Sequence, residues 1–392
     1  MRIVHVITRL ILGGAQENTL LTVEGLHHQH KDDVTLITGP AEGPEGDLFD
    51  RAHRQGLKVE IMPELVRAIR PATDWKAYRK LREAFRKLRP DVVHTHSSKA
   101  GILGRAAAWE ERVPLVVHTI HGLPFGPSET AARNRLYITL ERWAAKRCHA
   151  IVSVCDAMTE QALAAGVGRP EQYQTVYSGM EVDAFLKPPR SREEVRQEIG
   201  LAVDEVAFAT VARLFERKGH DDILDAAPEV LKANPKVRFV WIGSGIWRER
   251  LEAEAERLGV RHAIHFVGLV PPDRIPELLS ASDAVVHPSL REGLARVLPQ
   301  ALLVGRPAIS YDVDGAREVV LPETGILLPP RDIEGLKKAI LELADDPERR
   351  TTLGAEGRRR CTDQFRKETM TDQLRSLYSS RLNALARGRS GR

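Results

Sequence analysis

The chain has 392 residues, of which 42% are hydrophobic, and a formal net charge of +4. At about 100 to 200 residues per domain, this length predicts two globular domains, each large enough to bury its own core. The small net charge argues against a nucleic-acid partner, and no apolar run is long enough to span a bilayer.

Short apolar runs alternate with helical patterns through the first half of the chain. Runs that predict strands cover residues 3–8, 33–38, 58–61, 91–95, 115–119 and 150–154. Helical patterns cover residues 14–29, 47–55, 67–89, 101–110 and 131–148. This alternation predicts a parallel sheet with helices on both faces.

The helix predicted over residues 67–89 is strongly basic. Its cations are Arg67, Arg70, Lys76, Arg79, Lys80, Arg82, Arg86, Lys87 and Arg89. Apolar side chains recur among them at helical spacing, so the segment is a basic amphipathic helix. Two interpretations stay open: a solvated helix that covers the sheet, or a peripheral contact with an anionic membrane surface.

The alternation restarts after a polar, proline-bearing passage at residues 183–192. Strands are predicted at residues 206–211, 237–243, 264–267, 284–287, 308–310 and 326–328. Helices are predicted at residues 221–234, 247–258, 275–281, 297–304 and 333–344. This is the pattern of a second doubly wound domain. Because ligands bind at the carboxyl edges of such sheets, we expect a substrate cleft between the two domains.

The three cysteines, Cys148, Cys155 and Cys361, have neither metal-ligand spacing nor the even number of a disulfide framework. A reducing cytoplasm suits them best.

Met1 and Arg2 run directly into the first apolar strand pattern, so we expect no secretory leader. Any membrane contact should be a surface attachment at the inner face of the plasma membrane.

The most informative stretch runs from residue 283 to residue 307. A buried strand pattern stops at Pro288, and Glu292 and Gly293 then precede a helical pattern. Free amides at such a helix start can bind an anion, while the Glu292 carboxylate can accept hydrogen bonds from sugar hydroxyls. The stretch therefore predicts a site for a sugar attached to a phosphate.

Two cations follow the first strand of the second half. Arg213 and Lys218 occupy a loop between a strand and a helix, where a guanidinium and an ammonium group can straddle a diphosphate. The alternative is that they are ordinary surface cations. Gly243 and Gly245 form a strand-ending glycine turn that is weak evidence by itself.

Gly13 and Gly14 follow the first strand and open a helix. The third glycine of the dinucleotide fingerprint is missing, which argues against a nicotinamide cofactor. The pair fits a close backbone approach to another phosphate or a sugar. A tight turn with no ligand is the structural alternative.

Polar residues also end two strands of the first half. His94, His96 and Lys99 follow one of them, and His118 and His121 follow the other. Paired histidines suggest zinc, but no acid or cysteine is placed to complete a site. Side chains aimed at a hydroxylated acceptor explain them with fewer assumptions.

Taken in this order, the motifs resemble those of glycosyltransferase family 4 among the GT-B glycosyltransferases, especially bacterial enzymes of exopolysaccharide and cell-surface glycan assembly. The resemblance covers nearly the whole chain. It implies an α/β fold of two Rossmann-like domains that face a central cleft. It also implies a retaining, metal-independent transfer from a nucleotide sugar to a lipid-linked or glycan acceptor, with no cofactor.

The resemblance also implies roles for individual residues. Arg213 and Lys218 would neutralise the departing diphosphate, His121 would lie near the transferred sugar, and Glu292 would bind its hydroxyls. The expected donor-binding residues are Gly13, Gly14, Gly243, Gly293, Leu294, Ala295 and Gln300. The expected acceptor-side residues are His94, His96 and Lys99.

The sequence departs from the family pattern at Gln300, where the family places a second glutamate that binds the ribose hydroxyls. Glutamine keeps one carbonyl acceptor and loses the charge. Ala295 replaces a glycine, and Pro299 is tolerable only in the first turn of a helix.

A UDP-sugar donor is favoured, with a GDP-sugar next. The alternatives are a non-hydrolysing nucleotide-sugar epimerase and an inactive nucleotide-sugar-binding protein.

We expect four segments. Residues 1–185 form the acceptor-side domain, and residues 186–200 form a linker. Residues 201–364 form the nucleotide-sugar domain. Residues 365–392 form a last helix that packs back onto the first domain, followed by a basic tail.

Overall fold

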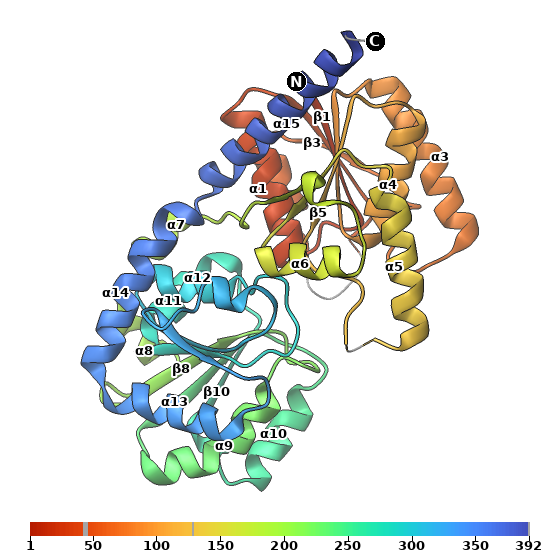
Figure 1. Cartoon of the computed structure of the whole chain (residues 1–392). Coiled ribbons are helices and arrows are strands. Elements are labelled where there is room, and N and C mark those ends of the chain that lie inside the picture. The colour runs from red at the N-terminus through yellow and green to blue at the C-terminus, as the bar shows by residue number, and fades with distance from the viewer. Residues whose placement is uncertain (42–45, 128, 391–392) are drawn as a thin grey trace. The chain divides into compact units, whose positions relative to one another are not determined.

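The computed structural model describes residues 1–41, 46–127 and 129–390, with the backbone alone for residues 388–390. The chain divides into two compact units, Met1–Met180 with Arg366–Arg392, and Glu181–Phe365. Each unit has its own parallel sheet, and helices lie on both faces of each sheet (Figure 1). The predicted α/β fold class is confirmed.

The first unit is built on a seven-stranded sheet of order β3-β2-β1-β4-β5-β6-β7. Its strands are β1 (Arg2–Ile7), β2 (Asp33–Thr38), β3 (Lys58–Ile61), β4 (Val92–His96), β5 (Leu115–Ile120), β6 (Ala150–Ser153) and β7 (Tyr173–Thr175). The central strands β1, β4 and β5 are buried on both faces, which explains why β1 and β5 are largely apolar in sequence. Strand β4 differs, because it ends in the polar residues His94, Thr95 and His96.

The helices of the first unit are α1 (Gly14–His28), α2 (Phe49–Arg54), α3 (Pro71–Leu88), α4 (Ser98–Glu110), α5 (Ala131–Ala145), α6 (Asp156–Ala164) and α15 (Lys367–Ser390). Helices α1 and α15 share one hydrophobic core with β1 through Ile3 and Ile7. Helices α3 and α4 share another core with the opposite face of that strand, through Val4 and Val6. The sheet is thus enclosed between two helical layers (Figure 1).

The carboxyl ends of two neighbouring strands, β1 and β4, lie next to each other in this sheet. Strands β1 and β4 pair in parallel, with His5 opposite His94. Ser97 follows β4 with a φ of 60°, and the sharp change of direction lets α4 begin one residue later. The Ser97 hydroxyl lies 2.7 Å from that of Thr8, which ties the loop after β4 to the end of β1.

The second unit is built on a six-stranded parallel sheet of order β10-β9-β8-β11-β12-β13. Its strands are β8 (Val206–Val211), β9 (Val237–Ile242), β10 (Ile264–Gly268), β11 (Ala284–His287), β12 (Ala308–Tyr311) and β13 (Gly325–Leu328). Its α-helices are α7 (Val182–Leu186), α8 (Arg192–Glu198), α9 (His220–Ala233), α10 (Arg248–Arg257), α11 (Ile275–Ala281), α12 (Val297–Leu303), α13 (Ile333–Asp345) and α14 (Pro347–Gln364).

The division of the chain differs from the predicted one. The units meet in sequence at Met180–Glu181 and again at Phe365–Arg366, and the residues expected to form a linker carry α8. Arg192 donates to the Ser280 and Ser282 carbonyls and lies 2.7 Å from Asp283, so α8 is fixed to the end of α11. Such distant contacts cannot be read from local polarity.

The last helix, α15, belongs to the first unit, where Met370, Leu374, Leu377 and Tyr378 join the core with β1. The final two residues of the predicted basic tail, 391 and 392, lie outside the described residues.

Candidate functional site

The loop after β8 approaches the loop after β11 through a glycine. Gly219 precedes α9 with a φ of 81°, a left-handed conformation that favours glycine. A Cβ atom at this position would lie 2.2 Å from the Pro288 carbonyl oxygen. The neighbouring Lys218 is therefore held beside the segment that contains Glu292.

The Glu292 carboxylate joins these two loops through a charged contact. Lys218 Nζ lies 2.6 Å from Glu292 Oε1, and His287 Nε2 lies 3.1 Å from the same oxygen. Burial opposes ionisation of the carboxyl, but the charge of Lys218 and the hydrogen bond from His287 outweigh it and hold the pKa of Glu292 well below its usual range. The loops thus pair a carboxylate with an ammonium group at neutral pH.

Backbone contacts fix both loops. The Leu290 amide donates to the Arg217 carbonyl at 2.9 Å, and the Ser289 hydroxyl donates to the same oxygen at 3.1 Å. The Glu292 amide donates to Asp314 Oδ2 at 2.9 Å. Because Asp314 holds the Glu292 backbone, the carboxylate has a defined direction.

Arg213 begins the same loop as Lys218, and its side chain is exposed. Its guanidinium lies 5.8 Å from the centre of the Phe215 ring. Gly243, at the end of β9, has a φ of 142°, and a Cβ there would lie 2.0 Å from the Ala212 carbonyl oxygen. The absence of a side chain at Gly243 therefore lets the β9 loop support the backbone that carries Arg213.

The other predicted donor residues surround the start of α12. Gly293 is half-buried and accepts a 3.1 Å hydrogen bond from the Gly315 amide at its carbonyl, while Leu294 and Ala295 are buried. Gln300 lies one turn into the helix, half-buried, and its side chain has no hydrogen bond within the part of the chain that the structure describes. Pro299 is the third residue of α12, so it does lie in the first turn.

Three predicted residues of the first unit lie near its surface. Gly13 is the N-cap of α1 and Gly14 its first residue, and both are exposed. Gly13 has an extended φ of 174°, which any residue adopts, so its conformation does not explain why it is glycine. Lys99 lies 2.6 Å from Asp74 Oδ1 and also donates to the Ala68 carbonyl, so it ties α4 to α3.

His94 and His96 are buried inside the first unit, with at most 1% of either side chain exposed. His94 bonds to Tyr378 of α15 through Nδ1 and to Thr119 Oγ1 through Nε2 at 2.6 Å. His96 bonds to His5 at 2.9 Å and to His121 at 3.1 Å. Both rings thus face protein partners, and the predicted direct contact with an acceptor is replaced by an internal network.

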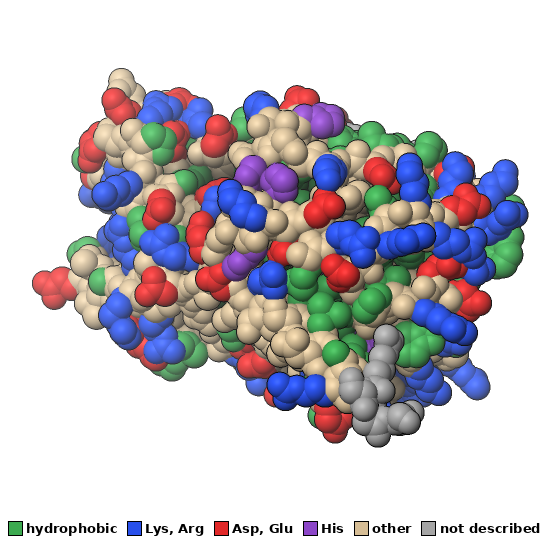
Figure 2. Space-filling view, turned by 90° about the horizontal axis from the view of Figure 1, so that it is seen from above, with side chains coloured by type: hydrophobic (Ala, Val, Ile, Leu, Met, Phe, Trp, Pro, Cys, Tyr) green, Lys and Arg blue, Asp and Glu red, His purple; other side chains and the backbone are tan. Residues whose placement is uncertain are grey.

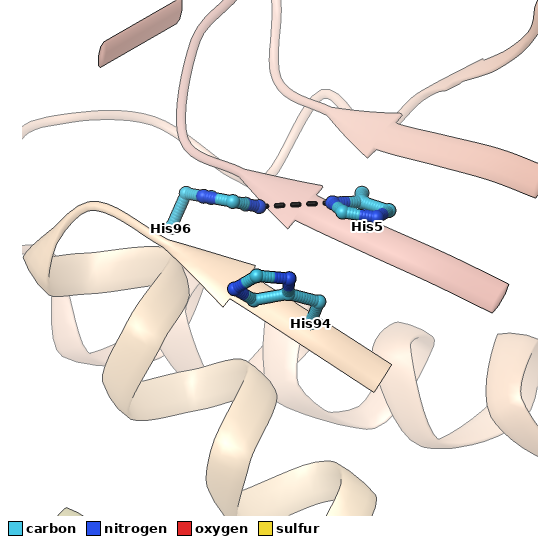
Figure 3. Close-up of side chains that lie close together, drawn as sticks. All are labelled: His5, His94 and His96. Carbon is cyan, nitrogen blue, oxygen red and sulfur yellow. Dashed lines mark hydrogen bonds between the residues drawn. The ribbon is translucent and has the colours of Figure 1, made fainter. Parts of the chain in front are cut away.

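His5, His94 and His96 come close enough to suggest a metal site, since ring nitrogens from all three lie within 4.8 Å of one another (Figure 3). Figure 3 also shows the hydrogen bond that joins His5 to His96. Five of the six ring nitrogens already have hydrogen-bond partners, and only His5 Nε2 lacks one among the described residues. The cluster is therefore a hydrogen-bonded network in this structure.

Four residues of these networks were not singled out from the sequence as site residues: His5, His287, Asp314 and Tyr378. His5 had a usable signal, because a histidine interrupts an otherwise apolar central strand. His287 had a weaker one, as the last residue of a buried strand beside Pro288. No sequence signal pointed to Asp314 or Tyr378, because their partners Glu292 and His94 are distant in the sequence.

Comparison with protein families gives two matches that together span most of the chain. Residues 13–179 match the glycosyl transferase 4-like domain, and residues 191–360 match the glycosyl transferases group 1 domain. One similar curated protein is the UDP-Gal:alpha-D-GlcNAc-diphosphoundecaprenol alpha-1,3-galactosyltransferase of Escherichia coli, 28% identical over 96% of each chain. The putative glycosyltransferase EpsD of Bacillus subtilis is 26% identical over 77% of this chain and 80% of its own.

Solved structures agree on the fold. Sucrose-phosphate synthase from Thermosynechococcus elongatus has a TM-score of 0.82 at 22% identity, covering 98% of this chain and all of its own. HepE from Anabaena, solved in complex with UDP-glucose, has a TM-score of 0.81 at 21% identity, covering 97% of this chain and 100% of its own.

The fold and these matches define a glycosyltransferase of the GT-B type. The chain belongs to the glycosyl transferases group 1, the family 4 glycosyltransferases, and the predicted resemblance is confirmed.

Proposed function

We propose that the protein transfers a hexose or N-acetylhexosamine from a nucleotide sugar, with retention of configuration and without a metal ion, to a lipid-linked or glycan acceptor of the cell surface. The observation that best supports binding of the nucleotide-sugar donor is the Lys218–Glu292 pair, with 2.6 Å between Nζ and Oε1. The Lys218 ammonium group can bind a diphosphate, and the Glu292 carboxylate can bind sugar hydroxyls. The contact between their two loops holds both groups side by side.

The roles of the charged groups follow from bond breaking. As the glycosidic bond to the nucleotide breaks, negative charge grows on the leaving phosphate oxygen. Lys218 and Arg213 stabilise that charge, and stabilisation that increases toward the transition state raises the turnover number. The Glu292 carboxylate is ionised, so it accepts hydrogen bonds from the sugar and orients it for transfer.

The donor and acceptor classes rest on related proteins. The Escherichia coli relative is named for UDP-Gal as donor and a GlcNAc-diphosphoundecaprenol acceptor. A Corynebacterium glutamicum relative, 30% identical over 54% of this chain, is named as GDP-mannose-dependent with a phosphatidylinositol mannoside acceptor. These names favour a UDP-sugar first and a GDP-sugar second, with an acceptor on a lipid.

A transfer assay tests this function. The purified chain is incubated with UDP- or GDP-sugars and a polyprenyl-diphosphate-linked sugar, with EDTA in one arm, and the product anomer is determined by NMR. We expect an alpha-linked product from an alpha-linked donor, at the same rate with EDTA. An inverted product or loss of the reaction in EDTA contradicts the mechanism, and a converted nucleotide sugar without acceptor would instead identify an epimerase.

We also propose that α3 and the segment before it contact an anionic membrane. Among the described residues, no helix has the length and apolar character needed to cross a bilayer. Leu81 and Phe85 of α3 face the core, while Trp75 is 61% exposed and Ile69, just before the helix, is 70% exposed. Exposed Arg67, Arg70, Lys76 and Arg79 accompany them. Apolar anchors beside cations suit an anionic lipid surface.

Figure 2 shows cations gathered toward the right, where Figure 1 draws α3, with acidic side chains among them. Some cations of this helix already have acidic partners. Lys80 pairs with Glu64 at 2.6 Å, and Arg82 and Arg86 both pair with Glu111. The membrane contact is therefore assigned to the other cations, with Lys76 and Arg79 as its centre.

Vesicle sedimentation tests this contact. Neutralising Lys76 and Arg79 to glutamine should weaken binding to vesicles with anionic lipid by about 30-fold, because each such cation contributes about 1 kcal/mol near the surface and about 1.4 kcal/mol corresponds to a factor of ten. The matched control replaces Arg257 and Arg359, which are 67% and 71% exposed in the second unit. Equal binding by both double variants would exclude α3 as the contact.

A further inference from the structure

One oxygen of the Glu292 carboxylate makes both of the hydrogen bonds that this group has in the described part of the chain. Lys218 Nζ lies 2.6 Å from Oε1, and His287 Nε2 lies 3.1 Å from it. Oε2 has no hydrogen-bond partner among the described residues, and it is not a buried atom. The Glu292 side chain is 18% exposed. The carboxylate is therefore held through one oxygen and open at the other.

His287 approaches Oε1 from a fixed place in the second unit. It is the last residue of β11, a strand with neighbours on both sides in the sheet. It pairs with Ser310 of β12, whose hydroxyl donates to the His287 carbonyl oxygen at 3.2 Å. Only 5% of the His287 side chain is exposed. The imidazole is thus carried by a buried strand and not by a loop.

The contacts of His287 indicate which ring nitrogen carries the proton. The Glu292 carboxylate is ionised and can only accept, so His287 Nε2 must donate to it. His287 Nδ1 is buried and has no hydrogen-bond partner among the described residues. A proton on Nδ1 would make an orphaned N–H, which is rarer in buried positions than an unsatisfied acceptor. The contacts therefore favour the tautomer with a proton on Nε2 and none on Nδ1.

The two partners of Oε1 constrain the carboxylate differently. An ammonium group has three donors on a flexible stem, so it can follow the carboxylate as it turns. The last torsion of a glutamate is broad and roughly two-fold, so Lys218 alone would let the two oxygens exchange places. A planar imidazole on a buried strand donates in one fixed direction. In the proposed function Lys218 also binds the diphosphate, whereas the His287 N–H serves Glu292 alone.

We propose that His287 is a positioning residue that keeps Glu292 Oε1 bound to the protein and leaves Oε2 as the oxygen for hydroxyls of the transferred sugar. The sugar then meets one oxygen of fixed position and does not bind across both. This use of the carboxylate rests on the proposed function. The His287 tautomer and its contact with Glu292 are properties of the second unit alone.

Nuclear magnetic resonance of the full chain with 15N-labelled histidine tests the tautomer, since two-bond proton–nitrogen correlations identify the protonated ring nitrogen. His287→Gln assigns the signal by removing it. We expect a single tautomer at neutral pH, with the proton on Nε2 of His287. A proton on Nδ1, alone or together with one on Nε2, would overturn the inference.

Transfer kinetics test the role of His287. His287→Leu should lower the turnover number about tenfold, the effect expected from losing one hydrogen bond to a charged group. His287→Gln should restore most of it, because its amide nitrogen can replace Nε2 as donor. Native turnover in His287→Leu, or no recovery in His287→Gln, would contradict the proposed role.

Calorimetric titration of UDP separates positioning from structural support. UDP affinity should stay close to the native value in His287→Leu, since UDP carries no sugar for Glu292 to hold. If His287→Leu lost UDP affinity as strongly as turnover, His287 would be supporting the whole site, and its positioning role would be refuted. A native chain with the expected tautomer but no transfer would remove the proposed function and leave the tautomer assignment standing.

The matched control is His265→Leu. His265 is a half-buried histidine of β10 in the same sheet, and it hydrogen-bonds to the Ile199 backbone. Its replacement should leave both the His287 tautomer and the turnover number unchanged. An equal loss of turnover in His265→Leu and His287→Leu would show a general effect of removing a histidine from this sheet and would refute the specific role of His287.

Discussion

Replacing Lys218 by alanine is expected to lower the turnover number for sugar transfer by about 100- to 1,000-fold, the usual cost of removing one donor that stabilises transition-state charge. The change removes the ammonium group 2.6 Å from Glu292 Oε1. Of the two partners of Glu292 Oε1, Lys218 and His287, only His287 then remains, so the carboxylate is also less firmly oriented. Both effects act on the reacting end of the donor.

Steady-state kinetics with the native donor measures this result. The matched control is Lys236→Ala in the same unit, where an exposed lysine pairs with an exposed Asp204 at 3.1 Å. Exposed pairs contribute little, so the control should retain nearly full turnover. Similar turnover for Lys218→Ala and Lys236→Ala would refute the role given to Lys218.

Replacing Gly219 by alanine is expected to cost about 3 kcal/mol of unfolding free energy and to reduce transfer strongly. An alanine at a φ of 81° is strained by about 1 to 2 kcal/mol. Its Cβ would also lie 2.2 Å from the Pro288 carbonyl oxygen, so the loops that hold Lys218 and Glu292 must move apart. The loss of transfer reports that movement.

Gly259→Ala is the matched control, because Gly259 has a φ of 71° and nothing within 4 Å of a Cβ placed there. It carries the backbone strain without the collision. Urea unfolding should therefore show a smaller loss for Gly259→Ala, about 1 to 2 kcal/mol, with transfer maintained. Equal losses of stability and transfer in both variants would show that the contact with Pro288 does not position the site.

The sequence predicted six of the seven strands of the first sheet and all six of the second, because parallel strands buried on both faces leave apolar runs separated by helical patterns. The short strand β7 (Tyr173–Thr175) was not predicted. The sequence also placed Lys218 and Glu292 at loops that follow strands, which is where the structure has them. Pro299 was expected to be tolerable only in the first turn of a helix, and α12 begins two residues before it.

Other features depend on which strands are neighbours, and local pattern does not contain that information. His5 meets His96 only because β1 lies beside β4 in the sheet. His94 was expected to face an acceptor, but Tyr378 of α15 and Thr119 of β5 occupy its two nitrogens. The passage expected as a linker became part of the second unit because Arg192 reaches Asp283.

Gln300 shows what a departure from the family pattern means in this structure. It lies one turn after the helix start, half-buried, without the charge that the family pattern has there. Its amide keeps a carbonyl acceptor. The Lys218–Glu292 pair is intact, so the proposed chemistry depends on groups that the departure leaves unchanged.

The most direct test of the Lys218–Glu292 site is calorimetric titration of UDP into the native chain and into Lys218→Ala. If Lys218 binds the diphosphate, the native chain should bind UDP, and the variant should bind it at least about tenfold more weakly, a difference of about 1.4 kcal/mol. Equal UDP affinity for the two proteins would contradict the assignment of the diphosphate to Lys218.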